Sequence, residues 1–416
     1  MPIPSEDLWA LAPEFWLTGL GLLLIVLDLF TDRERKVTVG WVAIAGLVLS
    51  LLPILGMIGQ PARTAFFNTY AIDGFAVFFK LIVVGSTILV ILAAMDYFRG
   101  QTSYEGELYI LLTFTALGLI LMAGSADLIL LALAIEFVSL TSYVLAGYFK
   151  TDARSTEAGI KYFLFGAAAS AIMIYGFTIL YGLTGETALY AIADRVRTAP
   201  QPALTVALGL SLAGFGFKIS MVPFHQWTPD VYEGAPTPVA AYLSVASKAA
   251  GFAALVRLLL VAFEPSRVDW VTLIAGLSAV SMTLGNLLAL PQRNIKRMLA
   301  FSSISHAGFI LIAVAAFKGD FGTPGLLIYI LAYTFTNLGA FFVAVAVGQR
   351  LGSDDIADYA GMAQRSPFLA LLMLFFMLSL TGIPPLAGFF GKFYIFGGAV
   401  NNGLLWLAIV GIVNSV

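Results

Sequence analysis

Residues 126–148 read ADLILLALAIEFVSLTSYVLAGY, and this stretch contains only two charged residues, Asp127 and Glu136. A helix needs about 20 mostly apolar residues to cross the hydrocarbon core of a bilayer. The stretch has that length, and its apolar residues do not alternate with polar ones as they do in membrane β-strands. It is therefore predicted to be a transmembrane helix with a carboxyl group near its middle.

Further apolar runs of this kind follow one another along the 416-residue chain. They span 13–30, 38–58, 73–95, 108–124, 160–183, 203–222, 237–262, 268–290, 297–317, 324–348, 366–395 and 400–416. Backbone groups in lipid must hydrogen-bond internally, so each run is predicted to be helical. The sequence ends inside an apolar run, and we expect a fourteenth helix and part of the thirteenth beyond it. The predicted fold is an all-α polytopic membrane protein with about 13–14 transmembrane helices.

The composition agrees with a membrane protein. The chain is 60% hydrophobic and 11% charged, whereas soluble domains carry about 25% charged residues. A soluble globular enzyme is therefore excluded. The net charge of −2 offers no basic surface for nucleic acid, and the absence of cysteine excludes disulfides, iron–sulfur clusters and thiolate zinc sites in this chain.

The distribution of basic residues predicts the orientation, because short cytoplasmic loops are enriched in lysine and arginine. If the N-terminus lies outside, the outer loops hold Arg63, Arg195, Arg197, Arg267 and Lys318. The inner loops then hold the larger set: Arg33, Arg35, Lys36, Arg99, Lys150, Arg154, Lys161, Arg293, Lys296, Arg297, Arg350 and Arg365. The sequence thus predicts an outer N-terminus.

The remaining basic residues, Lys80, Lys218, Lys248, Arg257 and Lys392, lie inside apolar runs. A charge at mid-membrane costs at least about 2.5–3.5 kcal/mol. Arg257 lies near the outer end of its run, and we expect it to reach the interface by snorkelling. Lys80 follows Asp73 by seven residues and could share a helix face with it, in either a structural or a functional role. The other three lie deep or beside helix breakers, which favours a functional role.

Acidic and histidine side chains also lie within apolar runs. Glu136 needs a basic partner, a water-filled cavity or a proton, and a neutral glutamic acid hydrogen-bonded between helices is the alternative. Asp127 is expected to cap its helix. His306 lies among serines in RMLAFSSISHAGF (297–309), which favours hydrogen bonding or proton relay over haem ligation with His225, for which no motif is present.

Prolines interrupt two of the runs. Pro223 follows Lys218 in the seventh run, and Pro384 and Pro385 precede Lys392 in the twelfth. Proline removes a backbone donor, and paired broken helices in the two halves of a transporter usually mark its transport site. Ordinary proline kinks are the alternative. We therefore predict that helices seven and twelve are broken at functional positions.

The spacing of the breaks predicts two repeats. A three-helix segment (1–107) is followed by a five-helix repeat (108–262) and a second five-helix repeat (268–416), each with its broken helix in fourth place. Because five is odd, the second repeat enters the membrane from the opposite face. This topology is that of inverted repeats.

Four segments together resemble a known family. STEAGIKYFLFG (155–166), FKISMVPFHQWTPDVYEGAPTPV (217–239), RMLAFSSISHAGF (297–309) and GIPPLAGFFGKFY (382–394) are similar to the antiporter-like membrane subunits of respiratory complex I, the NADH:quinone oxidoreductases. The form of the second segment resembles the N-type branch rather than the L and M types. The resemblance covers nearly the whole chain from about residue 70, although the chain stops before helix fourteen.

The resemblance implies proton translocation without redox chemistry in this subunit. It implies that Glu136 is the helix-five glutamate, Lys218 its helix-seven partner, Lys248 the connecting lysine, Lys392 the exit-side lysine, and His306 part of the polar axis. It also implies a bacterial inner-membrane complex in which subunit M and small subunits such as K are partners. FMN, iron–sulfur clusters and quinone would be held by other subunits.

Two other classes of protein remain open. A stand-alone Mrp-type cation/proton antiporter subunit would share the inverted repeats and lysines, although the N-type segment argues against it. A structural membrane spacer would not need buried lysines. A plastidial or cyanobacterial relative with ferredoxin as donor is a further alternative, whereas a nucleotide-binding enzyme is disfavoured because no soluble domain is present.

Overall fold

The structure is a computed structural model that describes residues 4–102, 104–266 and 269–415. Arg267, residue 268 and Val416, which the predictions above use, lie outside the described residues. Within the described ranges, 11 helices are long and apolar enough to cross a membrane, and the apolar helix α17 is shorter. The predicted all-α membrane fold is confirmed, and every predicted apolar run contains a helix.

The chain forms two compact units. The first unit consists of Met1–Phe149, Phe163–Phe215 and Ala246–Val268, and the second of Lys150–Tyr162, Gly216–Val245 and Asp269–Val416. The long helix α7 (Ala153–Thr184) and helix α9 (Gln201–Ile219) each contribute to both units. The predicted division at 1–107, 108–262 and 268–416, and the inverted relation of the repeats, remain predictions.

The first unit contains most of the N-terminal helices. Its elements are α1 (Ser5–Ala10), α2 (Ala12–Phe30), the 3-10 turn η1 (Arg33–Arg35), α3 (Val37–Leu55), β1 (Arg63–Ala65), β2 (Tyr70–Ile72), α4 (Gly74–Tyr97), α5 (Glu105–Gly124), α6 (Leu128–Ala146), α8 (Leu189–Arg195), α12 (Lys248–Arg257) and the π-helical η3 (Leu258–Phe263). The short antiparallel hairpin β1–β2 and helix α8 are too short for the apolar-run criterion and were not predicted.

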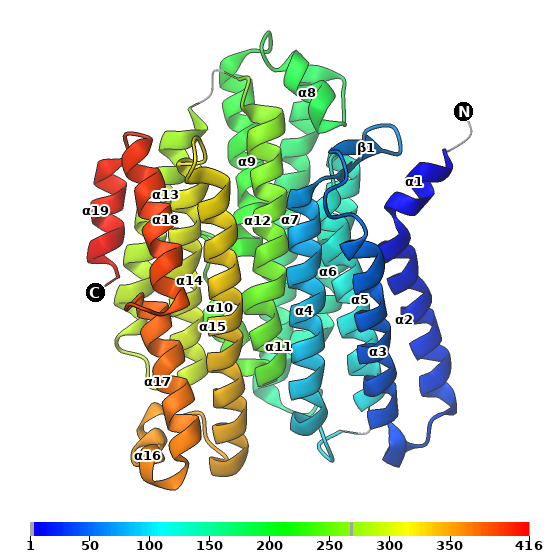
Figure 1. The fold of residues 1–416 in the computed structure, drawn as a ribbon, viewed down its shortest axis with the longest axis vertical. Helices are drawn as coiled ribbons and strands as arrows, with labels where there is room; N and C mark the ends of the chain where they lie inside the picture. Colours follow the sequence, from blue (N-terminus) through cyan, green and yellow to red (C-terminus); the bar gives the residue numbers. More distant parts are fainter. Residues whose placement is uncertain (1–3, 103, 267–268, 416) are drawn as a thin grey trace. The chain divides into compact units, whose positions relative to one another are not determined.

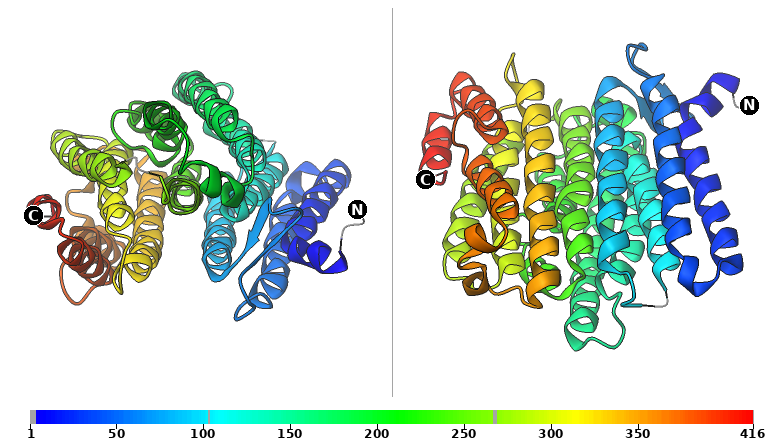
Figure 2. Two further views of the ribbon diagram at one scale, coloured as in Figure 1. Left: turned by 90° about the horizontal axis from the view of Figure 1, so that it is seen from above. Right: turned by 60° about the horizontal axis from the view of Figure 1, so that its bottom comes forward.

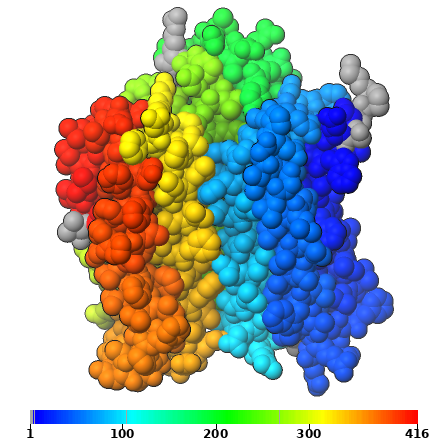
Figure 3. Space-filling view, viewed as in Figure 1, coloured from blue at the N-terminus to red at the C-terminus, as the bar shows by residue number. Residues whose placement is uncertain are grey.

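Helices α2, α3, α4 and α5 run side by side in the first unit (Figure 1). Helix α2 buries Leu17, Leu20 and Leu24, which recur at helical spacing, and exposes Leu22 and Val26. Residues of α2 and α3 cover a large part of this unit in the space-filling view (Figure 3). Exposed leucine and valine on this surface are what a lipid-facing helix requires.

The second unit contains the C-terminal helices. Its elements are α10 (Trp227–Gly234), α11 (Thr237–Tyr242), α13 (Trp270–Ala289), α14 (Ile295–Ala315), α15 (Gly322–Leu351), the 3-10 turn η4 (Ile356–Tyr359), α16 (Met362–Arg365), α17 (Pro367–Thr381), α18 (Ala387–Asn401) and α19 (Leu405–Val413). The π-helical segment η2 (Leu243–Ser247) begins in this unit and ends in the first.

Glycines allow α13 and α14 to pack closely. A Cβ atom at Gly285 would lie 2.6 Å from the backbone nitrogen of Ser305, and one at Gly308 would lie 2.6 Å from that of Met282. The Ser278 hydroxyl also donates to the Gly308 carbonyl at 2.7 Å. Small residues that bring backbones together, with a serine hydrogen bond across the contact, are typical of membrane helix pairs.

Both predicted helix breaks are present. Helix α9 ends at Ile219, Ser220 adopts a φ of 61°, and the next helix begins at Trp227. Helix α17 ends at Thr381, Gly382 adopts a φ of 91°, and α18 begins at Ala387 after the two prolines (Figure 2). The left-handed residue and the prolines end each helix and free carbonyl groups beside a lysine.

Candidate functional site

Lys218 lies at the first break. It is the second-last residue of α9 and is 2% exposed. Beyond it the chain turns back, so that the Met221 N–H donates to the Gly216 carbonyl at 2.7 Å. The Trp227 indole N–H donates to the Phe217 carbonyl at 3.1 Å. These bonds pair carbonyls that the end of the helix leaves open, and they hold the residues on either side of the lysine.

Charged residues fix the helix that follows the break. Asp230 on α10 accepts from Lys161 on α7 and from Arg297 on α14, at 2.6 Å each, and Glu233 pairs with the same arginine at 2.9 Å. Burial raises the pKa of Asp230, but the hydrogen bonds from the two cations outweigh burial and lower it below its usual value. Lys161 and Arg297 were predicted only as inner-loop residues, and this network was not predicted.

Lys392 lies at the second break and is 5% exposed. Its ammonium nitrogen donates to the carbonyl of Thr381, the last residue of α17, at 2.8 Å. It also lies 4.4 Å from the ring centroid of Phe309. The unpaired carbonyls at a helix C-terminus carry partial negative charge, and an aromatic face attracts a cation. The break therefore creates a site for the lysine ammonium.

The structure brings His306 and Lys392 together in the second unit. Both line a small cavity of about 10 Å³, which is the size needed for about one water molecule. The His306 Nδ1 atom lies 2.7 Å from the Tyr329 hydroxyl, which also lines the cavity. The hydroxyl and the imidazole can exchange donor and acceptor roles, so this pair can pass a proton.

More polar groups continue this site along α15. The Tyr333 hydroxyl donates to Ser303 at 3.0 Å, and the hydroxyls of Thr336 and Ser379 lie 3.1 Å apart. The next residue, Asn337, donates to the Ser244 hydroxyl at 2.7 Å. These residues were not predicted, although tyrosine, tyrosine and asparagine at positions 329, 333 and 337 recur every four residues along one helix face.

Glu136 and Lys248 belong to the first unit. Glu136 is half-buried in the middle of α6, and its Oε1 atom is buried without a hydrogen-bond partner among the described residues. An unpaired buried carboxylate oxygen is unfavourable unless the group is protonated or hydrated. Lys248 is 2% exposed and directly follows the π-helical segment η2. Such segments occur frequently at functional sites.

The structure corrects the expectations for two other basic residues. Arg257 does not snorkel: it is 5% exposed and donates to both carboxylate oxygens of Asp73, at 2.8 and 3.1 Å. Lys80 does not use Asp73; it pairs with the buried Glu14 at 2.9 Å. Asp73 is not the partner of Lys80 because its carboxylate caps α4 and binds the guanidinium of Arg257. That guanidinium offers two donors in one plane. The expected capping role of Asp127 is confirmed by its bonds to the first turn of α6.

Among the described residues, no cluster of three or more histidine and acidic side chains could hold a metal ion. The sequence contains no cysteine.

Broken helices and buried ionisable groups define a class of polytopic membrane proteins with polar groups inside the membrane. Residues 125–416 match the model of the family described as NADH:quinone oxidoreductase/Mrp antiporter, transmembrane. The chain belongs to this family.

Individual relatives extend the match to nearly the whole chain. It is 46% identical to the NADH-quinone oxidoreductase subunit N of Heliobacterium modesticaldum, over 96% of this chain and 84% of the relative. It is 44% identical to subunit N 2 of Chloroherpeton thalassium, over 98% and 82%. A chain in the respiratory complex I structure from Thermus thermophilus superposes with a TM-score of 0.80 at 33% identity, over 97% of this chain and 86% of that one.

Proposed function

We propose that this chain is the N-type membrane subunit of an NADH:quinone oxidoreductase and translocates protons without redox chemistry of its own. Membership of the family and the identity to N-type subunits support the assignment. The observation that carries the proton-transfer role is the cavity in the second unit. A histidine, a tyrosine hydroxyl and a lysine line this cavity, which has room for about one water molecule.

The proposed roles follow the positions of the residues in the chain. Glu136 is the carboxylate that controls Lys218, Lys248 is the connecting lysine, and Lys392 releases protons on the outer side. His306 relays protons through Tyr329 next to Lys392. The helix breaks beside Lys218 and Lys392 and the π-helical segment before Lys248 support these roles.

The proposed step is a transfer of one proton along coupled groups. A lysine in a low-dielectric site releases its proton easily, and a nearby carboxylate makes it hold that proton. When Glu136 is drawn away by a charge change in a neighbouring subunit, Lys218 gives its proton through water to Lys248 and onward to Lys392. Lys392 passes a proton to the outer side, and Lys218 is reprotonated from the cytoplasm, so the cycle closes.

The chain is proposed to work as one subunit of a larger membrane complex. The partners are other membrane subunits of complex I, including the antiporter-like subunit M and small subunits such as K. FMN, iron–sulfur clusters and quinone are held by other subunits of the complex. The location is a bacterial inner membrane, with the N-terminus outside and the repeats 108–262 and 268–416 inverted after the segment 1–107.

Lys218→Ala in the intact complex tests the proposal. Proton uptake driven by NADH oxidation is measured with a pH-sensitive dye in inside-out membrane vesicles. We expect pumping to be largely lost and coupled quinone reduction to slow. The exposed Lys318 provides the matched control, and Lys318→Ala should pump normally.

Three results would overturn the proposal. Full pumping in the Lys218→Ala complex would remove the central role of this lysine. Purification of the chain without flavin and iron–sulfur absorbance, together with cation/proton exchange in proteoliposomes, would identify an Mrp-type antiporter subunit instead. Pumping that survives loss of Lys218, Lys248 and Lys392 together would identify a structural spacer.

A further inference from the structure

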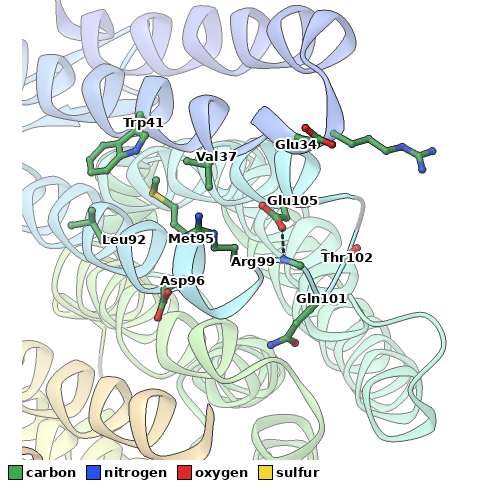
Figure 4. Close-up of a pocket in the computed structure, with 12 residues that line it drawn as sticks. Glu34, Val37, Trp41, Leu92, Met95, Asp96, Arg99, Gln101, Thr102 and Glu105 are labelled. Carbon is green, nitrogen blue, oxygen red and sulfur yellow. Dashed lines mark hydrogen bonds between the residues drawn. The ribbon is translucent and has the colours of Figure 1, made fainter. Parts of the chain in front are cut away.

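A cavity of about 750 Å³ lies in the first unit, and none of the proposed proton-transfer residues lines it (Figure 4). It is formed where η1 and the start of α3 meet the end of α4 and the start of α5. The residues that line it are Arg33, Glu34, Val37, Trp41, Leu92, Met95, Asp96, Arg99, Gly100, Gln101, Thr102 and Glu105. Its volume lies in the range of small-molecule sites.

The lining divides into an apolar and a polar part. Trp41 and Leu92 lie toward one end of the cavity, whereas Glu34 and Thr102 lie toward the other (Figure 4). The apolar part is open: Trp41 is 55% exposed and Leu92 is 42% exposed. Both belong to helices that are long and apolar enough to cross a membrane, so in a bilayer this part of the cavity would face acyl chains. Tryptophan is typical of the level where acyl chains meet headgroups.

The polar part holds charges of both signs. Arg33 and Arg99 contribute two guanidinium groups, and neither forms an ion pair with a carboxylate in the part of the chain that the structure describes. Glu105 accepts from the backbone N–H of Gly100 at 3.1 Å, whereas Glu34 and Asp96 add two further carboxylates to the wall. The site therefore offers donors for a phosphate and acceptors for an ammonium group.

We propose that this cavity binds the headgroup of a phospholipid with a primary amine, of the phosphatidylethanolamine type. The phosphate is bound by Arg33 and Arg99, because guanidinium groups match phosphate geometry. The ammonium donates to Glu34, and an acyl chain follows Trp41. Three carboxylates oppose an anionic headgroup, and a choline headgroup has no N–H to donate. In the orientation proposed above, the lipid belongs to the cytoplasmic leaflet, but its binding does not depend on proton transfer.

The test uses the intact complex in nanodiscs that contain phosphatidylethanolamine, phosphatidylglycerol and phosphatidylcholine in equal amounts. One lipid at a time carries a photoactivatable diazirine near its glycerol, and cross-linked peptides are mapped by mass spectrometry. We expect the ethanolamine lipid to label residues 33–41 and 92–102 in preference to the other two.

Three variants assign the charges. Arg33→Gln with Arg99→Gln should lower this labelling about tenfold, as expected for loss of charge-assisted hydrogen bonds. Arg195→Gln with Arg197→Gln, at exposed positions outside the cavity, should leave it unchanged. Glu34→Gln should remove the preference for ethanolamine over glycerol headgroups. If the first double variant does not fold, Arg33→Gln alone serves, because this residue lies on an exposed turn.

Several outcomes would overturn the inference. Equal labelling by all three lipids that does not respond to the arginine substitutions would show bulk lipid only. No labelling of these segments would show that another subunit covers the cavity. Loss of lipid labelling on addition of millimolar inorganic phosphate, equally for all headgroups, would identify a site for free phosphate instead.

Discussion

Arg257 and Asp73 form a bidentate ion pair, at 2.8 and 3.1 Å, although 184 residues separate them in the sequence. The pair joins the end of α12 to the start of α4 within the first unit. A third bond runs from the guanidinium to the Ala123 carbonyl at 3.5 Å. Because α12 also begins with Lys248, this anchor holds the helix that carries a proposed proton-transfer residue.

Arg257→Met is expected to destabilise the chain by about 3 kcal/mol, because it leaves a partly buried carboxylate without its partner. The measurement is the thermal unfolding midpoint of the purified complex. Arg63→Met provides the comparison, since Arg63 pairs with Asp7 at 3.1 Å but is 36% exposed. That change should cost at most about 1 kcal/mol. Equal shifts for both variants would contradict the anchoring role.

The same pair predicts a dependence of stability on pH. Burial raises the pKa of Asp73, but the hydrogen bonds and charge of Arg257 outweigh burial and hold it below its usual value. A carboxyl group with a lowered pKa stabilises the fold above its unfolded pKa, about 4, and this contribution is lost as the pH falls through the folded value. The unfolding midpoint of the wild type should therefore fall more steeply below about pH 4 than that of Asp73→Asn. Parallel curves for the two proteins would exclude this contribution.

The membrane-spanning helices of this protein were predictable because each lies in a long apolar run, whereas short helices such as α8 were not. The two breaks were predictable because prolines lie near Lys218 and Lys392. Asp73 was not predictable as the partner of Arg257, because the pairing depends on how distant segments pack. No signal in the sequence indicates that residues 63–72 form a hairpin or that Arg257 is buried, so snorkelling was the simpler expectation.

The candidate site was also only partly predictable from the sequence. The ionisable residues Glu136, Lys218, Lys248, His306 and Lys392 stand out in an apolar sequence, because charge inside a membrane is unfavourable. The hydroxyl groups that surround them do not, since serine, threonine and tyrosine are common in membrane helices. Only the three-dimensional packing of α14, α15 and α17 shows that Tyr329 contacts His306.

Tyr329→Phe tests that contact. It removes the hydroxyl 2.7 Å from His306 and keeps the ring. We expect the initial rate of proton pumping to fall about fivefold, which corresponds to the loss of about 1 kcal/mol from one hydrogen bond. Tyr181→Phe, at an exposed position, is the control and should pump at the normal rate. An unchanged rate in Tyr329→Phe would remove the tyrosine from the proposed relay.

Gly382→Ala tests whether the second break positions Lys392. Gly382 has a φ of 91°, and an added Cβ would lie 2.7 Å from the Cδ atom of Lys392. The variant should lose about 1–2 kcal/mol of stability through backbone strain and should also lose most of its pumping, because the ammonium is displaced from the Thr381 carbonyl.

Gly403→Ala separates the two effects. Gly403 has a similar φ of 76°, but an added Cβ there would meet no atom within 4 Å. It should lose a similar amount of stability and keep its pumping rate. If both variants pumped equally well, the geometry of the break would not control the lysine, and Lys392 would have to be positioned by the helices around it rather than by the end of α17.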